Sequence, residues 1–285
     1  MIAQRRGATS EPVASIVIEP SSGWAALNLR ELWAYRELLY FFVWRDLKVR
    51  YKQTVFGVLW AVIQPFMLMV VFSLFLGRLS GIAPAGVPYP LFAFAGLVPW
   101  TLFAKSLSGS SDSLVGASNL IQKVFFPRLL LPVSALGSQL LDFVIAMAVL
   151  VLLMLYFGTV PSLAFLWVLP LTVLALAVAL GAGVWLSAAN VRYRDVRYLV
   201  PFLVQIWLFA SPVAYSADIV PPAWLGLYYL NPMAGVIEAY RWAMLGGAGG
   251  PPVGALLAST IVTAAVLLTG LAYFRRVERT FADVI

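Results

Sequence analysis

The chain has 285 residues, of which 62% are hydrophobic and 11% charged, and its formal net charge is +7. It contains no cysteine and no histidine, which excludes thiol chemistry, disulfides, His or Cys metal sites and the usual proton shuttle at neutral pH. No GxxxxGKS/T phosphate-binding loop occurs in the sequence, so we expect any ATP that drives this protein to be hydrolysed on another chain.

Six apolar stretches are each long enough to cross a bilayer once, because about 20 helical residues span a hydrocarbon core of roughly 30 Å. They are residues 58–77, 88–107, 133–157, 162–187, 198–216 and 253–274. Of the 19 Lys and Arg residues, 17 fall in segments that one topology places on the same side, namely eight before the first stretch, Lys105, Lys123, Arg128, Arg192, Arg194, Arg197, Arg275, Arg276 and Arg279. The positive-inside rule therefore places both termini in the cytoplasm, and predicts an all-α, multi-pass protein of the inner membrane with six transmembrane helices.

The segment before the first stretch divides into two parts. Residues 1–27 read as a mobile cytoplasmic tail, and Asn28 with Glu31 is typical of a helix start. Residues 28–53 then alternate large apolar residues with charges at helical intervals, and one broad face is predicted to carry Leu32, Trp33, Leu39, Phe42 and Val43. Because this segment is too charged to span, we expect an amphipathic helix in the inner interface. A juxtamembrane anchor without a moving part is the alternative.

Two of the apolar stretches carry rows of aromatic and amide side chains. The first holds Trp60, Gln64, Leu68, Phe72 and Phe75 along one side, and the fifth holds Tyr198, Phe202, Gln205 and Phe209. Polar amides flanked by aromatics on two helices indicate a wet passage lined by rings. The alternative is that these aromatics pack in the core or form an interface belt.

An acidic residue, Asp142, lies well inside the third stretch, in a row with Ser134 and Ser138 and beside Gln139. An acidic group near the bilayer centre costs about 2.5–3.5 kcal/mol on insertion scales, so Asp142 should face protein or water. It either binds neighbouring helices or contacts a substrate. In the fourth stretch, Gly181 and Gly183 permit close helix packing.

The outer segment 217–250 is predicted to form two short helices that dip into the outer leaflet or form a simple cap. Pro221-Pro222-Ala223-Trp224 begins the first. Asn231-Pro232 is an N-cap followed by an N1 proline for the second, which should end near Leu245 at Gly246-Gly247. Glu238 and Arg241 are able to pair at i, i+3.

The inner loop 109–132 begins polar and becomes helix-like near Asn119-Leu120-Ile121-Gln122-Lys123, followed by Phe125-Phe126-Pro127-Arg128. Exposed phenylalanines beside basic residues suggest a docking site for a soluble partner. The alternative places both rings in lipid.

Four blocks in order resemble the ABC-2 type transporter permeases, and most closely the exporters of O-antigen, capsule and teichoic acid. The blocks are Arg45 to Lys52 followed by Gly57-Val58-Leu59-Trp60 and Gln64-Pro65; Asn119 to Pro132; Tyr193-Arg194-Asp195-Val196 with Ser211-Pro212-Val213; and Asn231-Pro232-Met233 to Arg241. The resemblance covers about residues 30–275.

The resemblance implies a type V exporter-like permease fold, spanning 28–285, that acts as a homodimer. Two copies of a separate nucleotide-binding subunit would bind ATP and Mg, with no cofactor, metal or catalytic residue on this chain and no nucleic-acid partner. The implied cargo is a lipid-linked polysaccharide moved through a channel at the dimer interface while membrane lipids hold its tail.

The resemblance also implies roles for the predicted segments. Residues 28–53 become the inner gate helix, and Arg45, Lys48, Arg50 and Lys52 become candidates for binding the lipid pyrophosphate, although topology and anionic-lipid contact explain these cations equally well. Channel-lining candidates are Trp60, Gln64, Phe72, Tyr198, Phe202, Gln205 and Phe209. Coupling to the ATPase falls to Asn119, Gln122, Lys123, Phe125, Phe126, Pro127, Arg128, Arg194 and Asp195. The outer gate candidates are Trp224, Tyr228, Tyr229, Asn231, Pro232, Glu238 and Arg241.

Three other functions compete with polysaccharide export. The first is export of a drug or small lipid by the same kind of permease. A secondary transporter would need intramembrane ionisable relays and usually internal repeats, and Asp142 alone is thin support for it. An integral-membrane glycosyl or phosphoryl transferase lacks clustered acids and any histidine.

Overall fold

The computed structural model describes residues 29–52, 56–77, 86–246, 250–278 and 281. All regular secondary structure in these residues is helical. The elements are α1 (Leu29–Ala34), α2 (Arg36–Tyr51), η1 (Gly57–Leu59), α3 (Trp60–Phe75), α4 (Tyr89–Gly116), α5 (Ser118–Lys123), α6 (Leu130–Tyr156), η2 (Leu163–Trp167), α7 (Val168–Arg192), α8 (Val196–Ala210), η3 (Ala217–Ile219), α9 (Pro222–Tyr228), α10 (Pro232–Leu245) and α11 (Val253–Glu278). The tail 1–27 and the predicted cap Asn28 lie outside the described residues.

Five helical segments are long and apolar enough to cross a membrane: Gly57–Phe75, Tyr89–Gly116, Leu130–Tyr156, Leu163–Arg192 and Val253–Glu278. The remaining apolar stretch forms α8, which has 15 residues. At 1.5 Å per residue α8 extends about 22 Å, short of a hydrocarbon core of roughly 30 Å. The count of six spans therefore stays a prediction, and it depends on α8 together with the buried segment 211–214 that follows it.

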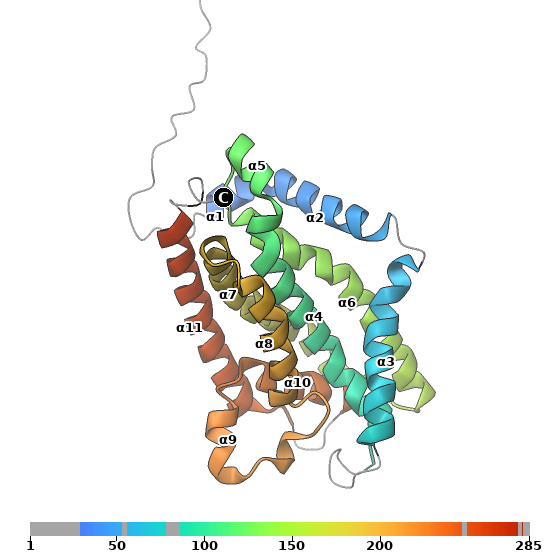
Figure 1. Ribbon diagram of the computed structural model, residues 1–285. Helices are drawn as coiled ribbons and strands as arrows, with labels where there is room; N and C mark the ends of the chain where they lie inside the picture. Colours follow the sequence, from blue (N-terminus) through green and yellow to red (C-terminus); the bar gives the residue numbers. More distant parts are fainter. Residues whose placement is uncertain (1–28, 53–55, 78–85, 247–249, 279–280, 282–285) are drawn as a thin grey trace, which may run out of the picture.

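The central helix of the bundle is α4, which packs against α3, α6, α7, α8 and α10 (Figure 1). It begins after Pro88 and continues to Gly116, beyond the predicted end at residue 107. The first part of the predicted 109–132 loop is thus helical. The reason is packing: Ser110 is fully buried against Gly183 of α7, where a Cβ would overlap its side chain.

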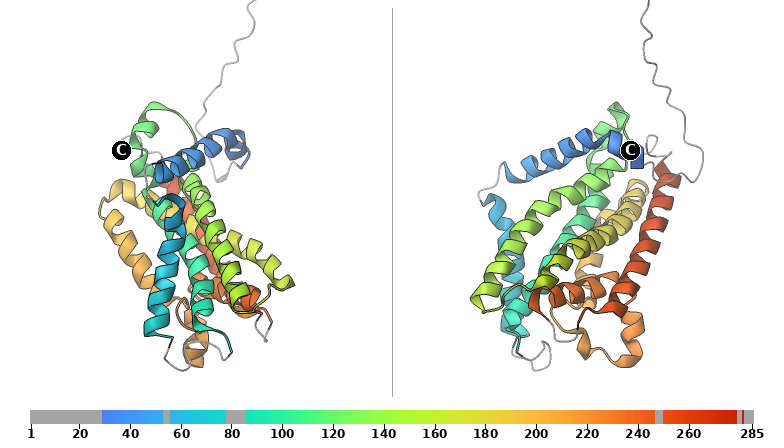
Figure 2. Two further views of the ribbon diagram at one scale, coloured as in Figure 1. Left: turned by 90° about the vertical axis from the view of Figure 1, so that its right-hand side faces the viewer. Right: turned by 180° about the vertical axis from the view of Figure 1, so that it is seen from behind.

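Small residues also bring α7 and α11 together. A Cβ added at Gly270 of α11 would overlap the backbone oxygen of Gly181, and a Cβ at Gly181 would lie 2.8 Å from the Cα of Leu267. The predicted close packing at Gly181 and Gly183 is therefore found, against α11 at the first glycine and against α4 at the second. Figure 2 shows α7 and α11 running along the same side of the bundle.

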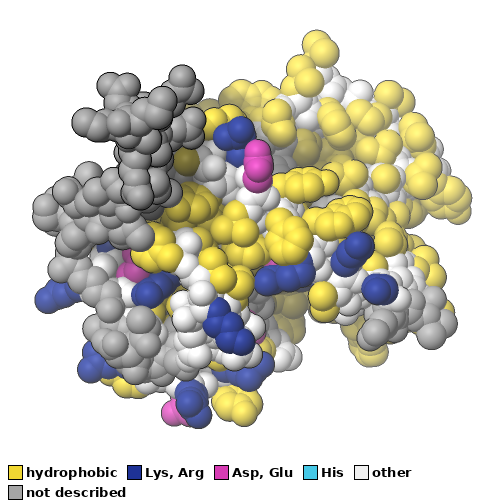
Figure 3. Space-filling view, turned by 90° about the horizontal axis from the view of Figure 1, so that it is seen from above, with side chains coloured by type: hydrophobic (Ala, Val, Ile, Leu, Met, Phe, Trp, Pro, Cys, Tyr) yellow, Lys and Arg dark blue, Asp and Glu magenta, His cyan; other side chains and the backbone are white. Residues whose placement is uncertain are grey.

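The two ends of the bundle differ in character. α1, α2 and α5 lie across one end, and α9 and α10 lie at the other (Figure 1). Seen from the α2 end, Lys and Arg side chains are spread over the surface (Figure 3), as expected for the side that the positive-inside rule places in the cytoplasm.

The interfacial helix is divided by a turn at Tyr35, between α1 and α2. Phe42 is buried, and Leu32, Leu39 and Val43 are partly buried. Trp33, predicted on the same face, is 71% exposed. That placement was wrong, because Leu32 and not Trp33 packs against the core cluster that contains Phe42.

Candidate functional site

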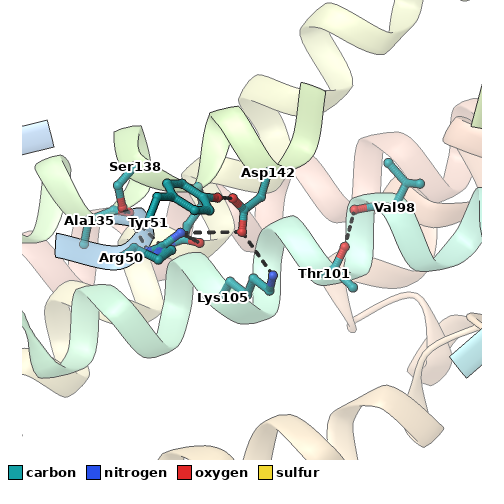
Figure 4. A network of polar contacts seen from close by, with 9 residues as sticks. Arg50, Tyr51, Val98, Thr101, Lys105, Ala135, Ser138 and Asp142 are labelled. Carbon is teal, nitrogen blue, oxygen red and sulfur yellow. Dashed lines mark hydrogen bonds and ion pairs between the residues drawn. The ribbon is translucent and has the colours of Figure 1, made fainter. Parts of the chain in front are cut away.

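The end of α2 is joined to the bundle by a polar cluster around Asp142 (Figure 4). Lys105 Nζ of α4 lies 3.1 Å from Asp142 Oδ2, and Arg50 Nη1 lies 3.5 Å from the same oxygen. The Tyr51 hydroxyl donates a hydrogen bond to Asp142 Oδ1. One carboxylate therefore connects three helices, α2, α4 and α6.

Two further side chains of α6 hold the guanidinium of Arg50. Its Nη1 donates to Gln139 Oε1 at 2.9 Å, and its Nη2 donates to Ser138 Oγ at 3.4 Å. Ser138 and Asp142 are four residues apart on one face of α6, so the predicted polar row is the surface that receives α2. Of the two predicted roles for Asp142, the structure displays the contact between helices.

The cluster differs from the sequence prediction in one respect. The sequence analysis counted Lys105 among the cations of the cytoplasmic side, next to the predicted end of its helix at residue 107, but α4 runs on to Gly116. Lys105 therefore lies about 16 Å before that end and reaches an acidic partner inside the bundle. Burial and the hydrogen bond to Asp142 raise the pKa of the Tyr51 hydroxyl to about 12, which keeps it a hydrogen-bond donor at neutral pH.

The four basic candidates on α2 do not form one group. Arg50 belongs to the Asp142 cluster. Arg45 Nη2 lies 2.8 Å from Asp46 Oδ1, and the Arg45 guanidinium also lies over the Phe42 ring at 5.1 Å. Lys48 and Lys52 are exposed.

The coupling segment around α5 presents some of its candidates to the outside and buries others. Phe125 is 68% exposed, whereas Phe126 is 4% exposed and packs edge-on against Phe42 of α2, with ring centroids 5.5 Å apart. The prediction of Phe126 as a docking side chain was wrong, because its ring is buried against Phe42 of α2. The exposed candidates are Asn119, Gln122, Lys123, Phe125, Arg194 and Asp195.

Arg128 also takes part in the fold. It donates to the backbone oxygen of Glu278, and its guanidinium lies over the Phe281 ring at 5.7 Å. Pro127 is partly buried beside it. A surface groove of about 250 Å³ is lined by 121–126 and Arg128, with the basic groups of Lys123 and Arg128 on its walls. This end of the molecule thus offers a partner an exposed ring, a groove and positive charge.

The aromatic rows of α3 and α8 are largely open on their outer side. On α8, Tyr198, Phe202 and Phe209 are 79%, 58% and 62% exposed, and Gln205 is also exposed. On α3, Trp60 and Gln64 are exposed. Phe72 is 7% exposed and belongs to the main core, so its placement on an open face was wrong.

At the opposite end, Asn231 connects α8 to α10. Its Oδ1 accepts from the Met233 amide at 3.1 Å, which caps α10, and from Trp207 Nε1 at 2.8 Å. Its Nδ2 donates to Ser211 Oγ at 2.8 Å and to the Ala210 carbonyl at 3.2 Å. α9 and α10 form at the predicted positions, and α10 ends at Gly246 with φ +68°. Among the other candidates Pro232 is buried, Tyr228 is partly buried and Trp224 is exposed.

The predicted pair of Glu238 and Arg241 does not form. Arg241 is 7% exposed and donates to the carbonyls of Val213 at 2.5 Å, Tyr215 at 3.1 Å and Phe92 at 3.3 Å. Glu238 instead accepts from the Tyr229 hydroxyl at 3.0 Å. The pairing was wrong because three backbone carbonyls and the face of Phe92, 3.6 Å away, already hold the guanidinium.

Comparison with known proteins identifies the family. The family model described as ABC-2 type transporter matches residues 37–245. This chain belongs to the ABC-2 type transporter family. The match spans α2 to the end of α10, and so includes the Asp142 cluster, the coupling segment, the aromatic rows and the outer helices.

Several named transporters are similar to this ABC-2 chain over most of their length. The O-antigen export system permease protein RfbA of Myxococcus xanthus is 30% identical over 260 residues, which cover 90% of this chain and 98% of that protein. RfbA of Klebsiella pneumoniae is 29% identical over 244 residues, covering 85% and 92%. The polysialic acid transport protein KpsM of Escherichia coli is 25% identical over 244 residues, covering 82% and 91%.

The sequence analysis did not single out three residues that make these contacts in this ABC-2 chain: Tyr51 and Lys105 at Asp142, and Trp207 at Asn231. Lys105 could have been recognised, because it is a single cation inside an apolar stretch and such a cation needs an acidic partner. Asp142 is the acid that the sequence itself offers. Tyr51 and Trp207 carry no such signal.

Proposed function

We propose that this chain is the membrane permease subunit of an ATP-driven exporter that moves a cell-surface polysaccharide, such as O-antigen, across the bacterial inner membrane. The observation that carries the proposal is the likeness to O-antigen export permeases over nearly their whole length. In this function both termini lie in the cytoplasm, on the side of α2 and α5. The basic surface at that end supports this orientation (Figure 3).

The open aromatic rows fit a polysaccharide better than an ion or a small polar solute. Two copies of the chain would bring the α3 and α8 rows together around a channel. Phe, Tyr and Trp rings suit the apolar C–H faces of sugar rings, and several weak stacking contacts let a chain slide. The six candidates that fit this role by exposure are Trp60, Tyr198, Phe202 and Phe209 with the amides Gln64 and Gln205.

The energy for transport comes from a separate nucleotide-binding subunit, present in two copies, which binds ATP and Mg. The exposed Phe125, the groove beside it and the basic Lys123 form the surface for this partner. Closure of the ATPase pair moves the coupling segment, and the contact of Phe126 with Phe42 passes that motion to α2.

The lipid carrier of the polysaccharide approaches beside α2, with its polyprenyl tail left in the bilayer. Lys48 and Lys52 are exposed on this helix and give long-range attraction for a pyrophosphate. Arg45 and Arg50 are already engaged by Asp46 and Asp142, so they bind a phosphate only by exchanging a carboxylate for it.

The proposal is tested by deleting the chromosomal gene and complementing with the wild-type chain. We expect the surface polysaccharide to disappear in the deletion strain, its lipid-linked precursor to accumulate on the cytoplasmic side, and both effects to be reversed by the wild-type chain. The ATPase subunit should co-purify with the chain in detergent. Normal surface polysaccharide in the deletion strain, with altered resistance to a drug, would assign the chain to drug export instead.

A further inference from the structure

The Asp142 cluster contains more positive than negative charge. Arg50 and Lys105 both approach one carboxylate oxygen, and no second acidic side chain joins them among the described residues. Two cations against one anion leave one positive charge without a counter-ion. In a site partly withdrawn from water that surplus is costly, and it favours the binding of an additional anion.

The geometry makes the two cations accessible and the carboxylate inaccessible. The side chains of Arg50 and Lys105 are 35% and 31% exposed, whereas that of Asp142 is 11% exposed. An anion arriving from outside therefore meets the cations first and reaches the carboxylate last. Asp142 lies behind them on α6, about 18 Å along the helix from Leu130.

Arg50 is held ready for a ligand by neutral groups. Gln139 Oε1 and Ser138 Oγ accept from its two terminal nitrogens, so the guanidinium keeps its place if Asp142 withdraws. The carboxylate in turn keeps the hydrogen bond from Tyr51, so it does not become a buried anion without a donor.

We propose that Asp142 is an exchangeable counter-ion, which pairs with Arg50 and Lys105 in the empty permease and is replaced there by the phosphate of a lipid head group. The inference rests on the proposed function, since a lipid-linked cargo supplies that head group. A pyrophosphate carries more than one negative charge and several acceptor oxygens, so it balances two cations where one carboxylate cannot. Lys105 of α4 thereby becomes part of the binding site.

The exchange also links cargo to movement. Arg50 and Tyr51 are adjacent at the end of α2, and Asp142 is the residue that holds both. When a phosphate binds Arg50 in place of Asp142, the hydrogen bond from Tyr51 is the contact that remains between the end of α2 and this carboxylate. Occupation of the head-group site therefore removes one contact between α2 and α6, while Gln139 and Ser138 continue to hold Arg50.

The test measures binding of farnesyl pyrophosphate to the permease with its ATPase subunit in phosphatidylcholine nanodiscs without nucleotide. If Asp142 competes with the ligand, the variants should change the affinity in opposite directions. Asp142→Asn should bind farnesyl pyrophosphate about ten-fold more tightly than wild type. Arg50→Gln and Lys105→Gln should bind it about ten-fold more weakly, as expected for the loss of one charge-assisted contact. Asp142→Glu, which keeps the competing charge, should bind like wild type. Glu37→Gln, an exposed acid on the same helix, is the matched control and should also bind like wild type.

Weaker or unchanged binding in Asp142→Asn overturns the proposal, because removal of a carboxylate that competes with the phosphate for Arg50 and Lys105 must raise the affinity. Inorganic pyrophosphate in the same assay identifies the source of the phosphate: equal affinity for the free anion and for farnesyl pyrophosphate contradicts a lipid head group as the ligand. The assay needs no polysaccharide, so it can fail while export is normal, or succeed where the cargo proves not to be a polysaccharide.

The movement is measured separately with spin labels. The chain has no cysteine, so Val49→Cys on α2 and Val144→Cys on α6, both exposed, give one label pair per chain. We expect farnesyl pyrophosphate to lengthen or broaden the wild-type distance distribution, and Asp142→Asn to have that distribution before ligand is added. Identical distributions in all three samples contradict a weaker contact between α2 and α6.

Discussion

The ring of Phe126, from the segment after α5, packs edge-on against the ring of Phe42 on the interfacial helix α2, with centroids 5.5 Å apart. Phe42 is 2% exposed and is the one buried side chain of α2 in the described residues. The segment that we propose binds the ATPase and the helix that we propose lies at the cargo entrance therefore meet at this aromatic contact.

Phe42→Ala should separate ATP hydrolysis from export. Removing the ring leaves a cavity beside Phe126 and costs about 3–5 kcal/mol of stability, while the exposed Phe125 remains available to the ATPase subunit. We expect normal co-purification of that subunit and retained ATP hydrolysis, but a large loss of surface polysaccharide. Phe41→Ala is the control, since Phe41 is 58% exposed on the same helix. Equal export defects in the two variants would contradict transmission through Phe42.

Phe125→Ala and Phe126→Ala should fail in different ways. Phe125 is exposed and Phe126 buried, so the first change weakens partner binding and the second destabilises the permease. Truncation of an aromatic anchor typically costs 2 kcal/mol or more, about thirty-fold in the dissociation constant. The measurements are the affinity of the purified ATPase subunit for each variant and the melting temperature of each variant alone. A stable Phe126→Ala variant that has lost its partner would reverse the assignment.

Replacing Phe202 and Phe209 of α8 together by alanine should reduce export without unfolding the permease. Both rings are largely exposed within one chain, so their loss removes stacking surface for sugars and little of the core of the subunit. We expect a several-fold lower rate of polysaccharide export and an unchanged melting temperature of the detergent-solubilised subunit. Phe72→Ala serves for comparison, because Phe72 is in the core and its truncation should lower the melting temperature.

Asn231→Ala should loosen the α10 end from α8. The change removes the cap of α10, worth about 1 kcal/mol, and deprives Trp207 and Ser211 of their partner. Asn231→Asp keeps the acceptor for Met233 and Trp207 but loses the donor to Ser211, so its melting temperature should lie between those of wild type and Asn231→Ala. The expected order is contradicted if the aspartate variant is the least stable.

The partly buried carboxyl of Glu238 predicts a pH dependence of stability. Burial raises its pKa above the ordinary value of 4.5, against the opposing effects of the Tyr229 hydrogen bond and of Arg241. The folded state thus binds this proton more tightly than the unfolded state, so the stability contribution is greatest at low pH and falls as pH rises from 4.5 through the folded pKa.

Glu238→Gln removes the ionisation and should therefore raise the melting temperature at pH 8, with the gain shrinking as pH approaches 4.5. Tyr229→Phe, which removes a hydrogen bond to the carboxylate, should move the wild-type transition to higher pH. Melting temperatures of the three proteins across pH 4.5–8 check both statements. A gain that is the same at every pH would contradict them.

Much of the fold follows from local sequence signals, and the misplaced residues have tertiary causes. The length of the apolar stretches predicted the positions of α3, α4, α6, α7 and α11. Asn231-Pro232 and Gly246 predicted both ends of α10. The extension of α4 beyond residue 107 depends on Ser110 fitting against Gly183, which no local pattern contains. The burial of Phe126 and Phe72 likewise depends on which neighbours cover them.

The sequence predicted several polar residues of the candidate site, but it did not predict the contacts that they make. Asp142, Ser138 and Gln139 were recognised as a polar row, but Arg50, Tyr51 and Lys105 reach them from 37 to 92 positions away in sequence. Similarly, Arg241 had a plausible partner at i−3, and backbone carbonyls of a distant turn hold it instead. The sequence thus identifies which side chains are polar or charged, but the residues that bind them become known only from the fold.

The most direct test of the account is transport by purified components in inverted proteoliposomes, with lipid-linked polysaccharide on the outside. We expect polysaccharide to become enclosed only when the permease, its ATPase subunit and MgATP are all present, and to remain outside with ADP. Uptake by the permease alone, driven by an ion gradient without nucleotide, would contradict the account.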